Sequence, residues 1–351
     1  SDVKGTTTDP VSKAMELLPL GPVVIIDTPG LDDEGTLGEE RVRRAHRVLD
    51  QTDIAVLVVD AAAGLSQADR GLTQLFEERH IPYVIAMNKA DLVTVPENIP
   101  ENMIFVSARE NGNIHALKEK IAALVRSVPP ARELIADLVS PGDAVVLVTP
   151  IDSAAPRGRL ILPQVQTLRE LLDKKCLVMS VTTDKLLPAL AALKEPPKLI
   201  ITDSQVFGYV YEHKPKESML TSFSVLFAAY KGDLPYYVEG AKMLDSLTNE
   251  SHVLIAECCS HAPLQEDIGR VKIPRMLKKR AGESITVDIM SGTDFPQDLS
   301  GYDLIIQCGA CMFNRKYVMS RIDRAKKQQV PMTNYGVTIA HLTGILDKIS
   351  M

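Results

Sequence analysis

Short apolar runs alternate with amphipathic stretches along most of the chain, and this alternation restricts its fold more than any other feature. Continuous apolar strands separated by helices are typical of parallel sheets that are covered on both faces. The sequence therefore predicts an α/β protein with mainly parallel sheets. The expected strands are Val23–Ile26, Ile54–Val59, Tyr83–Met87, Ile104–Val106, Ala144–Val148, Leu177–Val181, Lys198–Ile201, Val253–Ala256, Ile285–Ile289 and Leu304–Ile306. Expected helices include Glu39–Leu49, Val165–Leu172 and Arg315–Lys327.

Two breaks in the alternation predict three consecutive domains. The segment Ser127-Val128-Pro129-Pro130 ends the first series of strands and helices and is typical of a linker. A second break lies near Asn249–Ser251. We expect domains over residues 1–130, 131–248 and 249–351, and the 45% share of hydrophobic residues is enough for each to bury a core.

Hydropathy and charge argue against two classes of protein: membrane-spanning proteins and general nucleic-acid binders. No apolar run reaches the roughly 18 residues that a membrane span needs, and the polar start is unlike a signal peptide. Residues 1–128 carry 13 basic and 20 acidic side chains, and the remainder carries 26 and 25. Neither part is the basic body of a general nucleic-acid binder. We therefore expect a cytoplasmic protein with neither a membrane nor a nucleic acid as partner.

Four short motifs occur in the first domain in the order that a GTPase requires, and three of them directly follow a predicted strand. They are the threonines Thr6, Thr7 and Thr8, then Asp27-Thr28-Pro29-Gly30, Asn88-Lys89-Ala90-Asp91 and Ser107-Ala108-Arg109. Together they resemble the Era/TrmE group of translation-factor-type GTPases. This resemblance implies GTP and magnesium as ligands.

The later two motifs carry the groups that a guanine base needs. The Asp91 carboxylate can accept hydrogen bonds from the N1–H and the exocyclic amine of guanine, which adenine cannot supply. Asn88 can bind the other edge of the base, and the Lys89 stem can cover its face. Ser107 and Ala108 can close the base pocket through their backbone groups.

The earlier two motifs suit the phosphates and the metal ion. Asp27 can hold a magnesium-bound water, and Gly30 can present a backbone N–H to a γ-phosphate. A threonine of the Thr6–Thr8 cluster can ligate magnesium. However, no G-x-x-x-x-G-K-[ST] motif occurs in the 351 residues. We therefore expect a GTPase domain truncated before its P-loop, which binds GTP weakly and hydrolyses it negligibly.

The cysteines gather in the last domain. Cys258 and Cys259 follow one predicted strand, and Cys308 and Cys311 follow another, whereas Cys176 starts a strand and reads as a core residue. Parallel strands end at one edge of a sheet, so we expect the two groups to approach each other. Converging thiolates favour zinc, a 4Fe–4S cluster or a redox pair, and spacing alone leaves these open. One of the adjacent Cys258 and Cys259 is expected to be spare.

The order of a GTPase domain, a middle α/β domain and a C-x-H…C-x-x-C domain resembles the HydF family of FeFe-hydrogenase maturation GTPases. The last motif reads Cys259-Ser260-His261 and, after 46 intervening residues, Cys308-Gly309-Ala310-Cys311. The resemblance implies a dimerisation domain in the middle and a 4Fe–4S cluster held by Cys259, Cys308 and Cys311. The histidine that the family places before C-x-x-C is Gln307 here. The fourth ligand is then His261, Glu257 or an exchangeable molecule.

The resemblance implies a specific function. The chain would be a GTP-binding scaffold, homodimeric, that holds the 4Fe–4S cluster, receives a di-iron precursor from radical-SAM maturases and delivers it to apo-FeFe-hydrogenase. GTP hydrolysis would be its one catalytic activity. An Era-type ribosome-assembly GTPase and a zinc-stabilised GTPase without iron are the alternatives. The first would need a basic RNA-binding domain, which the near-neutral charge of residues 131–351 opposes.

Overall fold

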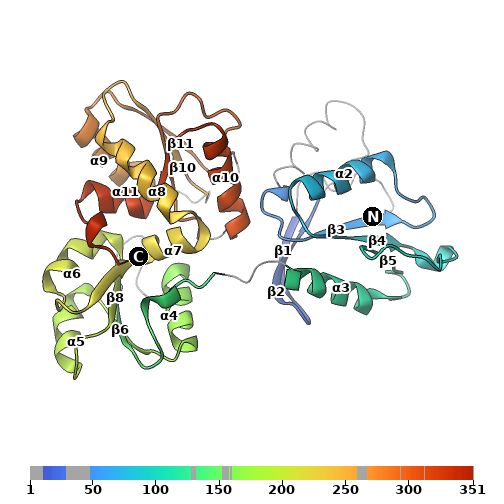
Figure 1. Ribbon diagram of the computed structural model, residues 1–351, viewed down its shortest axis with the longest axis horizontal. Helices are drawn as coiled ribbons and strands as arrows, with labels where there is room; N and C mark the ends of the chain where they lie inside the picture. The colour runs from blue at the N-terminus through green and yellow to red at the C-terminus, as the bar shows by residue number, and fades with distance from the viewer. Residues whose placement is uncertain are drawn as a thin grey trace. The chain divides into compact units, whose positions relative to one another are not determined.

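The computed structural model describes residues 11–28, 48–127, 132–151, 158, 160–258, 267–292, 294–311 and 313–350. The chain divides into two compact units, Ser1–Ala131 and Arg132–Met351 (Figure 1). The helices and strands described belong to an α/β fold with mainly parallel sheets, which confirms the predicted class. Within these ranges, no helix is both long and apolar enough to cross a membrane.

The described residues of the first unit form two separate sheets. An antiparallel hairpin pairs β1 (Val11–Leu17) with β2 (Gly21–Asp27). A parallel sheet follows in the order β3 (Ala55–Asp60), β4 (Tyr83–Asn88) and β5 (Met103–Phe105). The strand expected at Val23–Ile26 exists as part of β2, but its partner is antiparallel because a turn of only three residues joins it to β1. Its apolar residues are not buried, with Val24 63% exposed.

Two helices cover opposite faces of the β3–β5 sheet. Alternate residues of β4 point to opposite faces, so Ile85 packs with Phe76 of α2 (Gln67–Glu78), while Val84 packs towards α3 (Ile114–Ser127). Helix α2 begins at a capping box formed by Ser66 and Asp69. The predicted helix Glu39–Leu49 lies outside the described residues except for its last two.

The second unit holds two parallel sheets of four strands each. The middle sheet has the order β7-β6-β8-β9, with β6 (Ala144–Val148), β7 (Leu177–Val181), β8 (Leu199–Thr202) and β9 (Met219–Ser222). The C-terminal sheet has the order β11-β10-β12-β13, with β10 (His252–Ala256), β11 (Thr286–Met290), β12 (Leu304–Gln307) and β13 (Met332–Asn334). Strands β1, β9 and β13 were not predicted.

Helices alternate with these strands. They are α4 (Leu162–Asp173), α5 (Leu186–Ala192), α6 (Phe207–His213), α7 (Phe223–Lys231), α8 (Leu234–Ala241), α9 (Ile273–Ala281), α10 (Arg315–Lys327) and α11 (Tyr335–Leu342). Short 3-10 turns lie at Ala90–Leu92, Ala136–Leu138, Thr183–Lys185, Ser204–Val206, Lys242–Asp245 and Leu346–Lys348, and a π-turn at Ile268–Lys272 precedes α9. Helix α10 has the bounds that the sequence predicted.

One hydrophobic core joins the two sheets of the second unit. Its buried residues come from both sheets and from α7, α8 and α11, which lie between them in Figure 1. Helix α8, which we assigned to the middle domain, packs directly on β13: a Cβ added at Gly240 would lie 2.2 Å from the Met332 carbonyl oxygen. Our domain division at residue 248 stays a prediction.

Candidate functional site

The two predicted base-binding loops meet at one edge of the β3–β5 sheet. Because β4 and β5 are parallel, Asn88 and Ser107 both follow a strand end at this edge. The Asn88 Oδ1 accepts a hydrogen bond from the Ala108 backbone N–H at 3.0 Å, and the Asp91 Oδ1 accepts one from the Ser107 hydroxyl at 2.6 Å. That bond from Ser107 holds the pKa of Asp91 below its usual range. Both loops are therefore fixed to each other without a ligand.

Lys89 lies in the same loop, with its backbone in the left-handed region at φ 63°. Its Nζ donates to the Asp60 carboxylate at 2.7 Å, and this bond raises the pKa of Lys89 and lowers that of Asp60. Asp60 ends β3 directly opposite Asn88 in the parallel register. The loop therefore gains a second anchor that the sequence analysis did not identify.

The other predicted nucleotide ligands are described only in part. Asp27 is exposed at the end of β2, in the hairpin that forms a separate sheet. Thr6, Thr7, Thr8 and Gly30 lie outside the described residues. The described residues of this unit thus bring together the groups expected to bind the guanine base. The groups expected to bind the phosphates and the metal ion stay a prediction.

The C-terminal sheet brings Cys258 and Cys308 together. Strands β10 and β12 are parallel neighbours, with Ala256 opposite Gln307, so the residues that follow them share one edge. The Cys258 backbone N–H donates to the Cys308 Sγ at 3.1 Å, and the Ala310 N–H donates to the same sulfur at 3.4 Å. This arrangement stabilises a thiolate at Cys308.

The pKa values of Cys308, Cys311 and Cys176 are shifted in different directions. A hydrogen bond with the Cys258 side chain, the backbone donors and the charge of Arg321 together lower the pKa of Cys308 to about 7. Burial raises the pKa of Cys311, three residues later. Cys176 lies in the core of the middle sheet, as the sequence predicted. Burial raises its pKa as well.

The proposed fourth ligand Glu257 is buried and already engaged. Its Oε2 accepts bonds from Arg270 Nη2 at 2.8 Å and from the Ser291 hydroxyl at 2.9 Å. Gln307 is also buried, and its Oε1 has no hydrogen-bond partner among the described residues. Cys259 and His261 lie outside the described residues. Among those described, no group of three or more His, Cys, Asp or Glu side chains is arranged to hold a metal ion.

Three buried polar residues near the cysteines were not predicted. Lys231, at the end of α7, donates to backbone carbonyls of the C-x-x-C loop, which we define as residues 308–313. Arg321 is 2% exposed, and its Nε and Nη1 have no partner among the described residues. The same holds for the hydroxyl of Tyr335, whose pKa is raised by burial. Helical periodicity alone would place Lys231 and Arg321 on the surface. Their burial is evident only from the tertiary structure.

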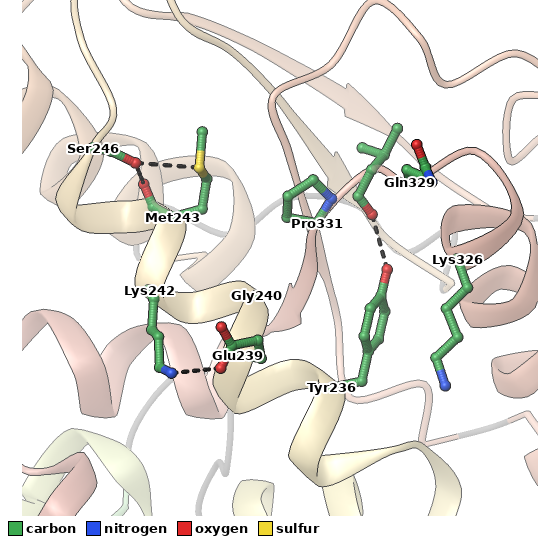
Figure 2. A pocket seen from close by; sticks show the side chains of 10 residues that line it. Tyr236, Glu239, Gly240, Lys242, Met243, Ser246, Lys326, Gln329 and Pro331 are labelled. Carbon is green, nitrogen blue, oxygen red and sulfur yellow. Dashed lines mark hydrogen bonds and ion pairs between the residues drawn. The ribbon is translucent and has the colours of Figure 1, made fainter.

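A separate hollow of about 500 Å³ lies between α8 and the chain that enters β13 (Figure 2). Its wall includes Tyr236, whose hydroxyl donates to the Val330 carbonyl at 2.9 Å. Its two lysines have carboxylate partners: Lys242 pairs with Glu239 and Lys326 with Asp233. None of the predicted site residues lines this hollow.

Several known GTPases are similar to the first unit. The tRNA modification GTPase MnmE of Streptococcus agalactiae serotype III (strain NEM316) is 32% identical over 124 residues, which are 34% of this chain and 26% of the relative. MnmE of Nitrosomonas europaea (strain ATCC 19718 / CIP 103999 / KCTC 2705 / NBRC 14298) is 31% identical over 132 residues, 36% of this chain and 28% of the relative. The chain thus spans about a quarter of the length of these curated relatives.

Among solved structures, the chain is similar to the crystal structure of Era in complex with MgGDPNP and nucleotides 1506-1542 of 16S ribosomal RNA. The identity is 16%, the match covers 52% of this chain and 84% of that chain, and the TM-score is 0.33.

Three family models match consecutive parts of the chain. The 50S ribosome-binding GTPase model matches residues 1–89, the hydrogen maturase F dimerization domain matches 134–232, and the hydrogen maturase F tetramerization domain matches 235–350. The last two cover more than half of the 351 residues, and they follow the GTPase match in the order that the motifs predicted. The chain belongs to the HydF family and carries a GTPase-type domain.

Proposed function

We propose that this chain is a GTP-regulated scaffold that holds a 4Fe–4S cluster and carries a di-iron precursor to apo-FeFe-hydrogenase. The observation that carries the proposal is the paired strand ends of β10 and β12, where two backbone N–H groups donate to the Cys308 sulfur. Donors of this kind stabilise a thiolate ligand and tune a cluster bound to it. The resemblance to HydF supports the di-iron precursor and apo-FeFe-hydrogenase as parts of this proposal.

The cluster ligands we propose are Cys259, Cys308 and Cys311, with His261, Glu257 or an exchangeable molecule as the fourth. The donor chemistry of the described thiols fits such a group. Arg321 donates through Nη2 to the Gly292 carbonyl and the Tyr317 hydroxyl, but its Nε and Nη1 have no partner among the described residues, and unsatisfied N–H groups on a buried cation support an anion in this region. A thiolate-ligated cluster, which supplies electron-transfer chemistry when bound, is such an anion.

Glu257 needs a rearrangement to serve as the fourth ligand. Its Oε2 is held by Arg270 and Ser291, so this oxygen would have to give up those bonds before it could ligate a metal. This favours an exchangeable ligand or His261 at that position. An exchangeable ligand would leave one iron open to a second molecule.

We propose that the first unit binds GTP and magnesium. The preformed contacts of Asn88, Asp91, Ser107 and Ala108 support recognition of guanine, with Lys89 against the base. Asp27, Gly30 and the threonines Thr6, Thr7 and Thr8 are the ligands proposed for the phosphates and the metal ion. Because the sequence contains no P-loop motif, we expect weak binding and negligible multiple-turnover hydrolysis by this chain alone. Hydrolysis at a normal rate would contradict that expectation.

We propose further that the chain works as a homodimer in the cytoplasm, with radical-SAM maturases and apo-hydrogenase as partners. The middle sheet supports self-association because its edge strand β7 has no neighbour on one side within the described residues. The matches to dimerization and tetramerization domains point the same way. A membrane or a nucleic acid is not proposed as a partner.

Two alternative functions have some support. The similar protein MnmE is described as a tRNA modification GTPase, which favours an RNA-linked GTPase. The near-neutral charge of residues 131–351 opposes it. Zinc without iron is the second alternative, because thiolates bind it equally well.

Anaerobic reconstitution followed by iron and zinc analysis and EPR tests the proposal. We expect about four irons per chain in the wild type and a large loss in Cys308→Ala. Cys176→Ala is the matched control, because that thiol is buried in the middle sheet's core and should leave the iron content unchanged. Stoichiometric zinc without iron would refute the cluster.

A further inference from the structure

The end of helix α7 is bonded to the C-x-x-C loop through one lysine. Lys231 is 6% exposed, and its Nζ donates to the carbonyl oxygens of Ala310 at 3.1 Å, Cys311 at 2.7 Å and Phe313 at 2.9 Å. An ammonium group has three protons, and three carbonyls of one loop lie within reach of them. The lysine therefore fixes the path of the backbone on both sides of Cys311.

A second set of bonds runs in the opposite direction. The Arg315 Nη1 donates to the carbonyl oxygens of Tyr230 at 3.2 Å and Gly232 at 2.7 Å, which flank Lys231. Segments about 80 residues apart are thus joined by reciprocal hydrogen bonds. One segment ends the helix that follows the middle sheet, and the other carries Cys311.

The charge of Lys231 also acts on the cysteines. Positive charge at Lys231 opposes the rise in the pKa of Cys311 that burial causes. Burying an ammonium group is costly unless its surroundings compensate it, so a lysine at this position must be stabilised by what the loop presents. The three carbonyl dipoles do this together with the ring of Phe227, whose centroid lies 5.5 Å from Nζ, and an anion at the thiols would add to it.

We infer that Lys231 is a positioning residue: it orders the C-x-x-C loop from the middle sheet's helix and supplies a fixed positive charge beside the metal group. Only the second part of this inference, the positive charge beside the metal group, rests on the proposed cluster. The ordering of the loop follows from the carbonyl contacts in the metal-free chain. Through this contact, the conformation of α7 and the order of the cysteine loop are coupled.

The test compares Lys231→Met with Lys214→Met. Methionine keeps most of the apolar stem and removes the ammonium group. Lys214 is the matched control, because its Nζ also donates to backbone carbonyls, those of Pro215 and Ser218, but within the middle sheet's own connection. Hydrogen exchange of the amides in residues 309–315 is measured first, in the metal-free chain. We expect exchange to accelerate about tenfold or more in Lys231→Met and to stay unchanged in Lys214→Met.

Two further readouts use the reconstituted chain. Loss of iron to a chelator should be about 10-fold to 100-fold faster in Lys231→Met, as is usual when an outer partner of a ligand is removed. The midpoint potential should become more negative, because a positive charge stabilises the reduced, more negative cluster. Lys231→Arg keeps the charge and should retain the wild-type potential more closely.

The outcomes separate the two proposals. If the wild type takes up no iron while Lys231→Met still loosens residues 309–315, the cluster is refuted and the positioning role stands. If exchange and iron loss match the wild type, or if Lys214→Met has the same effect, the positioning role is refuted. If Lys231→Met does not fold, Arg315→Met breaks the reciprocal bonds and must accelerate exchange in the same residues for the inference to survive.

Discussion

At the residue scale, recognition of guanine depends on a carboxylate that the protein holds in place before any ligand binds. Asp91 accepts a hydrogen bond from the Ser107 hydroxyl and keeps its charge well below neutral pH. Asp91→Asn should weaken binding of a fluorescent guanine nucleotide at least about tenfold, because one acceptor becomes a donor. Xanthine nucleotides, whose hydrogen-bonding groups are complementary to the side-chain amide of the variant, should bind the variant better than they bind the wild type. Equal loss for both bases would show that Asp91 acts only on folding.

Asp233 offers a prediction on pH at the same scale. A hydrogen bond from Lys326 lowers the pKa of this carboxylate below 3.8, and the side chain also caps α8 at Tyr236 N–H. A depressed pKa contributes stability above the unfolded value, and this contribution is lost as the pH falls through the folded value. Asp233→Asn should therefore cost about 0.5–1 kcal/mol at pH 7 and progressively less below pH 4.

Urea unfolding of the two proteins from pH 7 downwards measures this difference. Asp347→Asn is the matched control, because it makes the same change at an exposed carboxylate. A difference between wild type and Asp233→Asn that does not vary with pH would mean that the charge contributes nothing and that packing alone is affected.

At the scale of elements, we predict opposite effects on stability when alanine replaces each of two helical glycines. At Gly240 of α8 an added Cβ would meet the Met332 carbonyl oxygen of β13 at 2.2 Å, whereas at Gly208 of α6 nothing lies within 4 Å. Gly240→Ala should force the helix from the sheet and cost about 2–3 kcal/mol. Gly208→Ala should stabilise by up to about 1 kcal/mol, because alanine loses less backbone entropy. Chemical unfolding measures both, and equal changes would contradict this packing.

Periodicity predicted the strands other than β1, β9 and β13 because most of them contain a short run of apolar residues between stretches of helical spacing. It failed at β9 and β13, which lack an apolar run: β9 has two apolar residues before Thr221 and Ser222, and β13 has only Met332 before Thr333 and Asn334. The partner of β2 was also missed, since β1 contains the polar Ser12 and Lys13 and remains exposed. Strands this short or exposed are defined by the neighbours they pair with, and a single sequence does not show these.

At the scale of the whole molecule, the sequence predicted which loops meet, but not what supports them. Parallel topology placed Asn88 near Ser107 and Cys258 near Cys308 before any coordinates were needed. Lys231 and Arg321 could not be predicted, because their burial depends on packing between the two sheets of the second unit. Glu257 belongs with them: the sequence suggested it as a possible fourth cluster ligand, but it could not show that Arg270 and Ser291 hold its carboxylate.

Self-association is the prediction that involves the whole molecule, and the edge of β7 defines how to test it. The Leu177 N–H donates towards β6, to Asp143, and the Val181 carbonyl accepts from Thr149 on the same side. Because N–H groups alternate along a strand, the N–H of Ser180 points away from β6, to the open edge.

Ser180→Pro removes that outward donor without breaking the ladder to β6. If two copies pair through β7, the variant should shift to monomer in light scattering coupled to size exclusion, while its circular dichroism stays that of the folded chain. Ser180→Ala keeps the N–H and should remain associated. A Ser180→Pro variant that associates as strongly as the wild type would place the contact elsewhere, since a proline at this position cannot donate across an intermolecular ladder.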